Sequence, residues 1–152
     1  MTLLKYIYIG DLLSKRCKYT NAEVSLLGRL IRSEAVGEGN FGMMLVGNVV
    51  VNRVVARCLE FKRQKTITKV INAKNAFDGI KRPLFKKGAT AKERELALKT
   101  IKFWRANPAT SALWYYYPGK KKKCKSKFWG SFCGKYKNHC FYEPPSKKTC
   151  GL

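Results

Sequence analysis

The chain has 152 residues, a length that suits one domain with a substantial buried core. Hydrophobic residues make up 45% of it, which argues against wholesale disorder. The 32 Lys and Arg residues outnumber 9 Asp and Glu and give a net charge of +23, which favours polyanionic partners but does not choose among nucleic acid, anionic membrane and bacterial cell wall.

Residues 1–18 are predicted to be an N-terminal extension, with a short helix as one option. Residues 1–10 are apolar but are interrupted by Lys5 and lack a small-residue cleavage site, so we expect no signal peptide. No apolar stretch approaches the roughly 20 residues that a spanning helix needs, so we expect no membrane span. The domain proper is predicted to cover residues 19–152.

Thr20 and Glu23 have the spacing of a capping box, which predicts a helix from there to about residue 35. Apolar residues follow at helical spacing: Val24, Leu27 and Ile31. Gly37 and Gly39 then favour the end of this helix.

Residues 42–57 form a second apolar segment. Its valines favour a strand on propensity alone, but its length and the spacing of Asn48 and Asn52 favour a buried helix, which is our prediction. A short helix is predicted over residues 66–72.

Thr90 and Glu93 form another capping-box pattern. It predicts a helix that runs to about residue 106 and is closed by the Asn107-Pro108 pair.

The C-terminal third has a different character. Residues 112–118 read as an aromatic strand and residues 137–142 as a second short strand, with a loop rich in Lys, Gly and Cys between them. These elements predict an α+β fold, mostly α, with a single domain and a small C-terminal β-hairpin.

Most basic residues are lysines, including an unbroken run over residues 120–123. Readers of base sequence rely more on Arg, so this composition weakly disfavours sequence-specific binding and leaves nonspecific polyanion binding open. An equally simple interpretation is that many of these lysines only solubilise the surface.

The six cysteines, an even number, are compatible with disulfides, although the sequence does not give the pairing. None has CxxC spacing, which disfavours a structural zinc site, and free thiols remain an alternative. They are Cys17, Cys58, Cys124, Cys133, Cys140 and Cys150.

Glu34 is the strongest candidate for catalysis. It follows Ile31 by three residues and so continues the apolar stripe of its predicted helix. Loss of hydration there would raise the pKa of the carboxyl, and an acid that stays protonated near neutral pH can protonate the departing oxygen of a glycosidic bond. The alternative is a buried Glu satisfied by a backbone amide or an Arg.

Other polar residues are weaker candidates. Glu38 and Asp78 are possible second carboxylates, as base or nucleophile, although nothing in their spacing proves a pair. Asn52 could hydrogen-bond to Glu34 or to sugar hydroxyls, or could hold helices together. His139, the only histidine, could bind substrate, orient a carboxylate or be structural.

The aromatic run could stack against sugar rings. In a strand, alternate side chains face opposite sides, so Trp114 and Tyr116 would share one face and Tyr115 and Tyr117 the other, with one pair in the core. The sequence contains no Ser-His-Asp set, P-loop, Rossmann fingerprint or HExxH motif.

Five blocks together resemble the SleB/CwlJ family of cell-wall hydrolases. Residues 26–39, LLGRLIRSEAVGEG, are similar to the family signature RL(I/M)xxEAxGEG. The other blocks follow in the family's order: VGNVVVNR at 46–53, NAFD at 75–78, ALWYYYP at 112–118 and NHCFY at 138–142. The resemblance covers residues 20–150 and is closer to the shorter CwlJ-type members, from which the chain departs in its N-terminal extension, Cys17, Cys133 and its lysine content.

The resemblance implies a lysozyme-like or lytic-transglycosylase-like fold that cuts peptidoglycan of the spore cortex during germination. The family's catalytic glutamate corresponds to Glu34. In lytic transglycosylation one Glu serves as acid and then base, because the 6-hydroxyl of muramic acid attacks the anomeric carbon, so no cofactor or second carboxylate is required. We expect substrate contacts from Asn52, Phe77, Tyr115, Tyr117 and His139.

The sequence leaves three alternatives to a spore cortex-lytic enzyme open. A phage-encoded wall lysin would have the same chemistry. A non-catalytic basic protein would coat wall or nucleic acid, and a structural spore-coat protein would be held by Cys cross-links. Without a leader, the spore enzyme would reach the coat and cortex boundary by mother-cell deposition, with coat proteins as possible partners, whereas a phage enzyme would be released by lysis.

Overall fold

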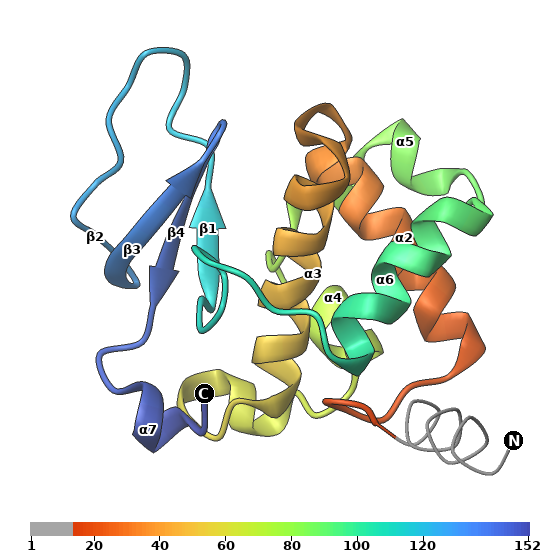
Figure 1. Ribbon diagram of the computed structural model, residues 1–152, viewed down its shortest axis with the longest axis horizontal. Helices are drawn as coiled ribbons and strands as arrows, with labels where there is room; N and C mark the ends of the chain where they lie inside the picture. The colour runs from red at the N-terminus through yellow and green to blue at the C-terminus, as the bar shows by residue number, and fades with distance from the viewer. Residues whose placement is uncertain (1–13) are drawn as a thin grey trace, which may run out of the picture.

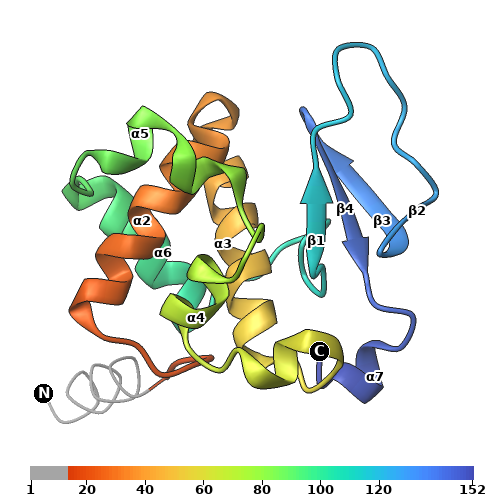
Figure 2. The same cartoon turned by 180° about the vertical axis from the view of Figure 1, so that it is seen from behind.

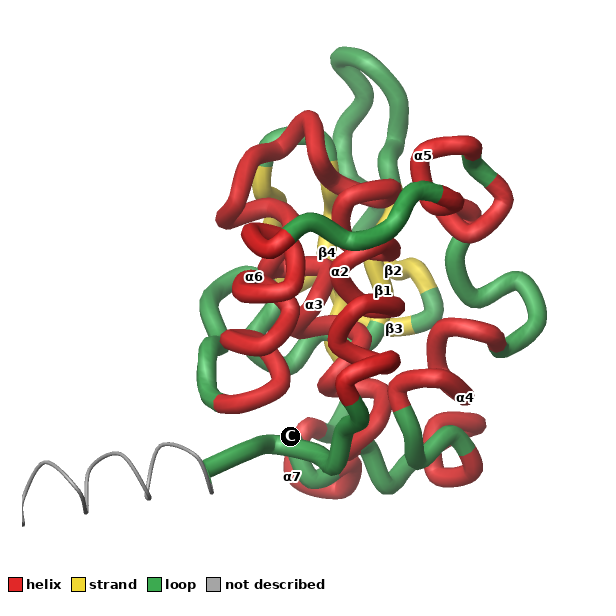
Figure 3. The backbone as a smooth tube through the Cα atoms, turned by 90° about the vertical axis from the view of Figure 1, so that its right-hand side faces the viewer, coloured by secondary structure: helices red, strands yellow, loops and turns green. Residues whose placement is uncertain are grey.

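The computed structural model describes residues 14–152, and the expectations for residues 1–13 lie outside that part of the chain. Most helices occupy one side of the molecule, and a small sheet, with the short C-terminal helix below it, occupies the other (Figure 1, and from behind in Figure 2). Seen from the helical side, the strands lie behind the helices (Figure 3). The helices are α2 (Asn21–Ala35), α3 (Gly39–Val55), α4 (Ile67–Asn72), α5 (Pro83–Lys86), α6 (Ala91–Lys102) and α7 (Lys147–Cys150).

Capping starts the two outer helices as predicted. In both α2 and α6 the N-cap Thr side chain accepts the backbone N–H of the Glu three residues on, and that Glu side chain accepts the N-cap N–H. Helix α2 ends at Ala35 and passes through a 3₁₀ turn, Val36–Glu38, to Gly39, whose φ of 77° suits glycine.

Helix α3 is the centre of the molecule and lies between the other helices and the sheet (Figure 1). Val46 and Val50 pack in the helical core, while Leu45 and Val49 pack against Phe141 of the sheet. A helix covered on both sides is apolar all round, which explains why its sequence resembles a buried strand. The structure confirms the helix prediction.

Helix α6 stops at Lys102, so the prediction that it reaches residue 106 is wrong. The side chain of Asn48 accounts for the difference. Its amide donates to the carbonyl of Trp104 at 2.6 Å and accepts the N–H of Ala106 at 3.1 Å. The N–H groups of Phe103 and Trp104 still donate to Lys99 of α6, but the Trp104 carbonyl and the Ala106 N–H are hydrogen-bonded to α3, which turns the chain out of the helix.

The sheet has four antiparallel strands in the order β1-β4-β3-β2. The predicted strands β1 (Trp114–Tyr116) and β4 (His139–Glu143) pair directly, with Tyr115 opposite Phe141. The intervening segment was expected to be only a loop, but it forms β2 (Lys127–Phe128) and β3 (Gly130–Tyr136). The overall α+β prediction is confirmed, and the predicted hairpin is extended by two strands.

Two disulfides fix the C-terminal part. Cys58 pairs with Cys150, and Cys124 pairs with Cys140, while Cys17 and Cys133 are free thiols. The pairing joins the terminal helix α7 to the segment after α3, and the loop after β1 to strand β4. Among residues 14–152, none of the helices combines the length and the apolarity that a bilayer crossing needs.

Candidate active site

A cleft of about 840 Å³ runs between the helices and the sheet. Its wall on the sheet side carries aromatic residues of β1 and the residue after it, among them Tyr115 and Tyr117. Arg53 of α3 and Phe77 line it from the helical side. Four carboxylates also line the cleft: Glu34, Glu38, Glu60 and Asp78.

Glu34 lies in the last turn of α2 and is half-buried. Its Oε1 accepts the backbone N–H of Gly79 at 2.9 Å. Burial raises the pKa of the Glu34 carboxyl and nearby Asp78 adds to this, whereas the Gly79 hydrogen bond and the charge of Arg82 act in the opposite direction. The result is a carboxylic acid with an increased protonated fraction at the cleft wall, as required of a proton donor.

The segment that holds Glu34 was not identified from the sequence. Ser33 donates its hydroxyl to the carbonyl of Gly79 at 2.7 Å, and Arg82 donates to the carbonyl of Ser33 at 3.0 Å. A Cβ on Gly79 would lie 2.8 Å from Glu34 Oε1, closer than real Cβ contacts allow. Gly79 is therefore the residue that lets this backbone approach the carboxyl.

Tyr115 faces Glu34 from β1. Its hydroxyl is buried and has no hydrogen bond of normal geometry within residues 14–152. Burial and the adjacent Glu34 raise the pKa of Tyr115 well above its usual range, so the phenol keeps its proton. Its ring lies 5.0 Å from His139 and 6.4 Å from Phe77, between centroids.

Arg53 is a site residue that the sequence analysis did not select. The residue is only 7% exposed, and its guanidinium donates to the carbonyl of Leu113 at 2.7 Å and lies 4.7 Å from the ring centroid of Phe77. Burial lowers the pKa of Arg53 to about 10, which leaves it charged at neutral pH. It therefore places a fixed positive charge near Glu34 and Tyr115.

Glu38 and His139 form a buried pair at one end of the cleft. Glu38 Oε2 lies 3.4 Å from His139 Nδ1, and Glu38 Oε1 accepts the N–H of Asn138 at 3.2 Å. Burial and the charge of Arg82 lower the pKa of His139 to about 4, so the imidazole is neutral and the contact is not an ion pair. Burial also raises the pKa of Glu38. Both side chains connect the start of α3 to the β3–β4 turn.

The other predicted site residues lie at different depths. Phe77 is 4% exposed and supports Arg53, whereas Tyr117 is 52% exposed at the rim. Asp78 is exposed beside Gly79 and raises the pKa of Glu34. The structure thus brings Phe77, Asp78, Tyr115, Tyr117 and His139 to the same cleft as Glu34.

Asn52 is the exception, and its expected role at the substrate is corrected. The side chain is fully buried and donates to the carbonyls of Ala109 and Ala112, both at 2.9 Å, while its oxygen accepts from Arg16 at 2.6 Å. Asn52 does not line the cleft. It fixes the segment before β1 and the chain before α2 to α3.

No group of three or more His, Cys, Asp or Glu side chains gathers closely enough within residues 14–152 to hold a metal ion. Independently of that, the cleft places the carboxyl of Glu34 close to a neutral phenol and a buried guanidinium, an arrangement that can transfer a proton.

Two solved structures have the same fold. The catalytic domain of Bacillus cereus SleB superposes with a TM-score of 0.67 at 21% identity, covering 83% of this chain and 93% of that one. The catalytic domain of the germination-specific lytic transglycosylase SleB from Bacillus anthracis gives 0.66 at 21% identity, covering 82% and 97%. The fold is thus that of a SleB catalytic domain.

Sequence comparison gives the family. Residues 37–142 match the model of the family described as Cell Wall Hydrolase. Cell wall hydrolase CwlJ of Bacillus subtilis (strain 168) is 41% identical over 132 residues, 86% of this chain and 91% of that protein. CwlJ of Oceanobacillus iheyensis is 40% identical over 129 residues, covering 84% and 90%. The chain belongs to the cell wall hydrolase family, as its sequence motifs predicted; Glu34 lies just before the residues matched by the family model.

Proposed function

We propose that this chain cleaves the glycan strands of peptidoglycan at the bond between N-acetylmuramic acid and N-acetylglucosamine, with Glu34 as the catalytic acid. The observation that carries the proposal is the half-buried Glu34 carboxyl, whose pKa is raised in a cleft walled by aromatic rings. Membership of the cell wall hydrolase family supports peptidoglycan as the substrate class.

In the proposed reaction, protonated Glu34 gives its proton to the glycosidic oxygen as the bond from that oxygen to muramic C1 breaks. The 6-hydroxyl of the same muramic acid then bonds to C1 and passes its proton to the Glu34 carboxylate. This closes a 1,6-anhydro ring and restores the acid without water or a second carboxylate.

Neighbouring groups suit the two halves of this cycle. Arg53 supplies a positive charge that stabilises the Glu34 carboxylate left after the first proton transfer, and the Gly79 N–H does the same at 2.9 Å. Tyr115 keeps its proton and offers a donor to the carboxylate or to a sugar oxygen.

The arrangement of the other acids leaves Asp78 as the main candidate for the base that a hydrolase would need. Glu38 Oε1 accepts a backbone N–H, and Oε2 lies against His139. Exposed Asp78 is the acid next to the Glu34 site that remains available to activate water. A hydrolase would need such a base, whereas the anhydro route needs only Glu34.

We further propose the spore cortex during germination as the setting. The support is the B. anthracis relative, which is named as a germination-specific lytic transglycosylase, and the CwlJ relatives. Deposition at the coat and cortex boundary, with contacts to coat proteins, belongs to the same proposal.

The test is mass spectrometry of soluble muropeptides released from purified cortex sacculi by the wild type and by Glu34→Gln. We expect products that are one water lighter than reducing-end muropeptides, lost in the variant. Full-mass reducing ends lost in the variant would indicate a hydrolase and would make Asp78 the next residue to change.

Glu60→Gln is the matched control, because it makes the same isosteric change at an exposed acid of the same cleft. It should retain activity. Equal release by wild type and Glu34→Gln would overturn the assignment of Glu34. Sacculus binding without release by the folded wild type would favour a non-catalytic wall-binding protein.

A further inference from the structure

The distribution of charge along the chain is uneven. No Asp or Glu lies between Glu95 and Glu143, so the whole sheet except its last residue is free of acids. Within this stretch, residues 119–127 join β1 to β2, and we call them the lysine arm. The arm carries six lysines: Lys120, Lys121, Lys122, Lys123, Lys125 and Lys127.

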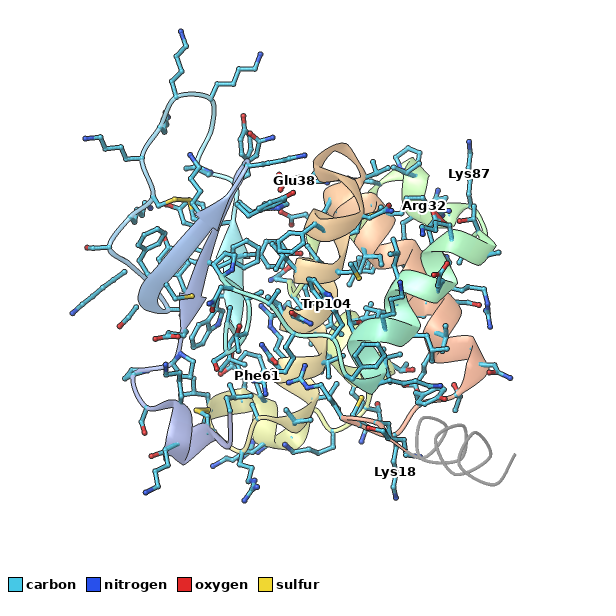
Figure 4. The ribbon with its side chains drawn as sticks, viewed as in Figure 1. Lys18, Arg32, Glu38, Phe61, Lys87 and Trp104 are labelled. Carbon is cyan, nitrogen blue, oxygen red and sulfur yellow. A yellow bond between two sulfur atoms is a disulfide. The ribbon has the colours of Figure 1, made fainter. Side chains whose placement is uncertain are left out.

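The charges of the arm are unneutralised. All six lysines are exposed, and within residues 14–152 none of them forms an ion pair. The loop stands away from the rest of the domain (Figures 1 and 2), and side chains with nitrogen tips extend from it into open space (Figure 4). The arm is therefore a concentrated positive surface that has no acidic partner in the part of the chain that the structure describes.

The arm is nevertheless fixed at its base. The Cys124–Cys140 disulfide ties it to β4. The N–H of Lys125 donates to the Tyr116 hydroxyl at 3.0 Å, and the carbonyl of Lys125 accepts the Tyr142 hydroxyl at 2.7 Å. These bonds hold the lysine charges at a defined place and limit the conformational freedom of the loop.

Both ends of the arm open into the cleft. Tyr116 and Tyr117 precede it, Phe128 and Trp129 follow it, and all four line the cleft. Trp129 is 80% exposed and Tyr117 52% exposed, so aromatic surface continues from the cleft to the foot of the arm. A polymer that extends from the cleft over these aromatic residues would reach the foot of the arm.

The lining of the cleft suits a phosphate backbone poorly. Its four carboxylates, Glu34, Glu38, Glu60 and Asp78, outnumber its three basic side chains, Arg53, Lys74 and Arg82, so it offers no continuous basic track to a nucleic acid. A glycan strand fits this pattern better, because its sugars are largely uncharged and its carboxylates project sideways on stem peptides. Flexible ammonium groups suit such carboxylates at variable positions.

We infer that the lysine arm binds the stem-peptide carboxylates of the glycan strand whose sugars occupy the cleft. This inference rests on the proposed function and adds to it a recognition of substrate charge. Attraction between exposed charges accelerates encounter by about tenfold or more at low salt and is screened as ionic strength rises. The arm thus contributes to binding of the wall and not to the chemical step.

The test compares two charge-matched variants. One replaces Lys120, Lys121, Lys122 and Lys123 by Gln; the control replaces four exposed lysines on the helical side, Lys18, Lys69, Lys86 and Lys87. Figure 4 shows Lys18 and Lys87 far from the sheet. Each variant is mixed with sacculi from which phosphate polymers have been removed. One batch of these sacculi keeps its carboxylates, and in the other batch the carboxylates are amidated. Co-sedimentation gives binding, and muropeptide release gives activity.

We expect the arm variant to bind native sacculi about tenfold more weakly than the control at low salt, with release at saturating sacculi retained. The difference should disappear on amidated sacculi and at high salt. Equal loss in both variants, or a loss that survives amidation, would overturn the inference. Duplex DNA serves as a second probe, and an arm variant that loses binding to DNA but not to sacculi would also overturn the inference.

The two proposals fail separately. If the wild type releases muropeptides but the arm variant binds sacculi as well as the control variant does, only the inference about the lysine arm fails. If binding depends on the arm and on carboxylates but nothing is released, the proposed cleavage fails, and the arm remains a wall-binding surface.

Discussion

Glu34 Oε1 and the backbone nitrogen of Gly79 lie 2.9 Å apart, across 45 residues of sequence. This hydrogen bond joins the end of α2 to the 3₁₀ turn Asp78–Lys81. Because Ser33 also binds the Gly79 carbonyl, the carboxyl and the turn that contacts it are held by adjacent residues of one helix. The position of the acid therefore depends on the absence of a side chain at Gly79.

Gly79→Ala should displace the Glu34 carboxyl, since the new Cβ would lie 2.8 Å from Oε1. Misplacing a catalytic group by about 1 Å can cost about 100-fold, so we expect a loss of that order in muropeptide release. Gly88→Ala is the control, because nothing lies within 4 Å of its Cβ. Unimpaired release by Gly79→Ala would contradict the assigned geometry.

Glu34→Gln should stabilise the fold while it abolishes release. The pKa of Glu34 is raised above its ordinary value mainly by burial, so the native state holds its proton more tightly than the unfolded chain. The stabilisation of this group is thus present at low pH and is lost as pH rises through the folded pKa. Replacing it by a neutral amide should raise the free energy of unfolding at pH 7 by about 0.5–2 kcal/mol, measured by denaturant titration. A less stable variant would contradict this.

His139 should make the protein sensitive to acid. Its folded pKa of about 4 lies below the usual 6.5, so the unfolded chain binds more protons between these values. The contribution of His139 to stability is complete above pH 6.5 and is lost as the pH drops toward 4. Burial and, second, the charge of Arg82 lower the pKa of His139, and the raised pKa of Glu38 partly offsets the loss of stability at low pH. Unfolding free energy measured from pH 7 to 4 should decline less steeply in His139→Gln, and parallel curves would show that His139 is not the source.

The Cys124–Cys140 disulfide should contribute about 3 kcal/mol to stability, because it closes a loop of 16 residues. Cys124→Ser with Cys140→Ala is expected to lower the free energy of unfolding by that amount and to weaken sacculus binding through the loosened arm. Electrophoresis without reductant should still show a monomer, because both bridges lie within one chain. Chains linked through cysteines would instead favour a cross-linked coat protein.

The buried ion pair of Arg32 and Glu93 should be essential for folding. Their atoms approach to 2.7 Å, and Arg32 also donates to the carbonyls of Leu84 and Gly88, so the pair holds the segment before α6 against α2. Glu93→Gln leaves a buried charge without its partner and should cost about 3–5 kcal/mol. Glu95→Gln, in an exposed pair with Lys99, should cost less than about 1 kcal/mol in the same unfolding assay.

Most of the helices could be predicted from local patterns in the sequence. Capping boxes at Thr20 and Thr90 gave the starts of α2 and α6 because they act within three residues. Glu34 was identifiable because its spacing from Ile31 continues an apolar stripe. Strand β3 was missed because its sequence, GSFCGKY, contains two glycines and no β-branched residue, and its order comes from pairing with β4.

The remaining site residues depend on contacts that spacing does not reveal. Gly79 and Arg53 act through backbone groups and rings far away in sequence. The prediction for Asn52 was wrong for the same reason. A polar residue on an apolar helix suggested a contact with substrate, but its side-chain amide donates to carbonyls of residues 109–112. Which buried polar groups meet one another is a property of the tertiary structure.

The bridge between Cys58 and Cys150 has a consequence for proteolysis. The exposed run over residues 120–123 offers a trypsin-like protease several adjacent cleavage points. A cut there would leave an N-terminal piece with Cys58 and a C-terminal piece with Cys150, still covalently joined. Because β1 stays paired with β4 and both contribute to the cleft wall, such a nicked, two-chain molecule should keep the residues of its cleft together and separate into fragments only after reduction.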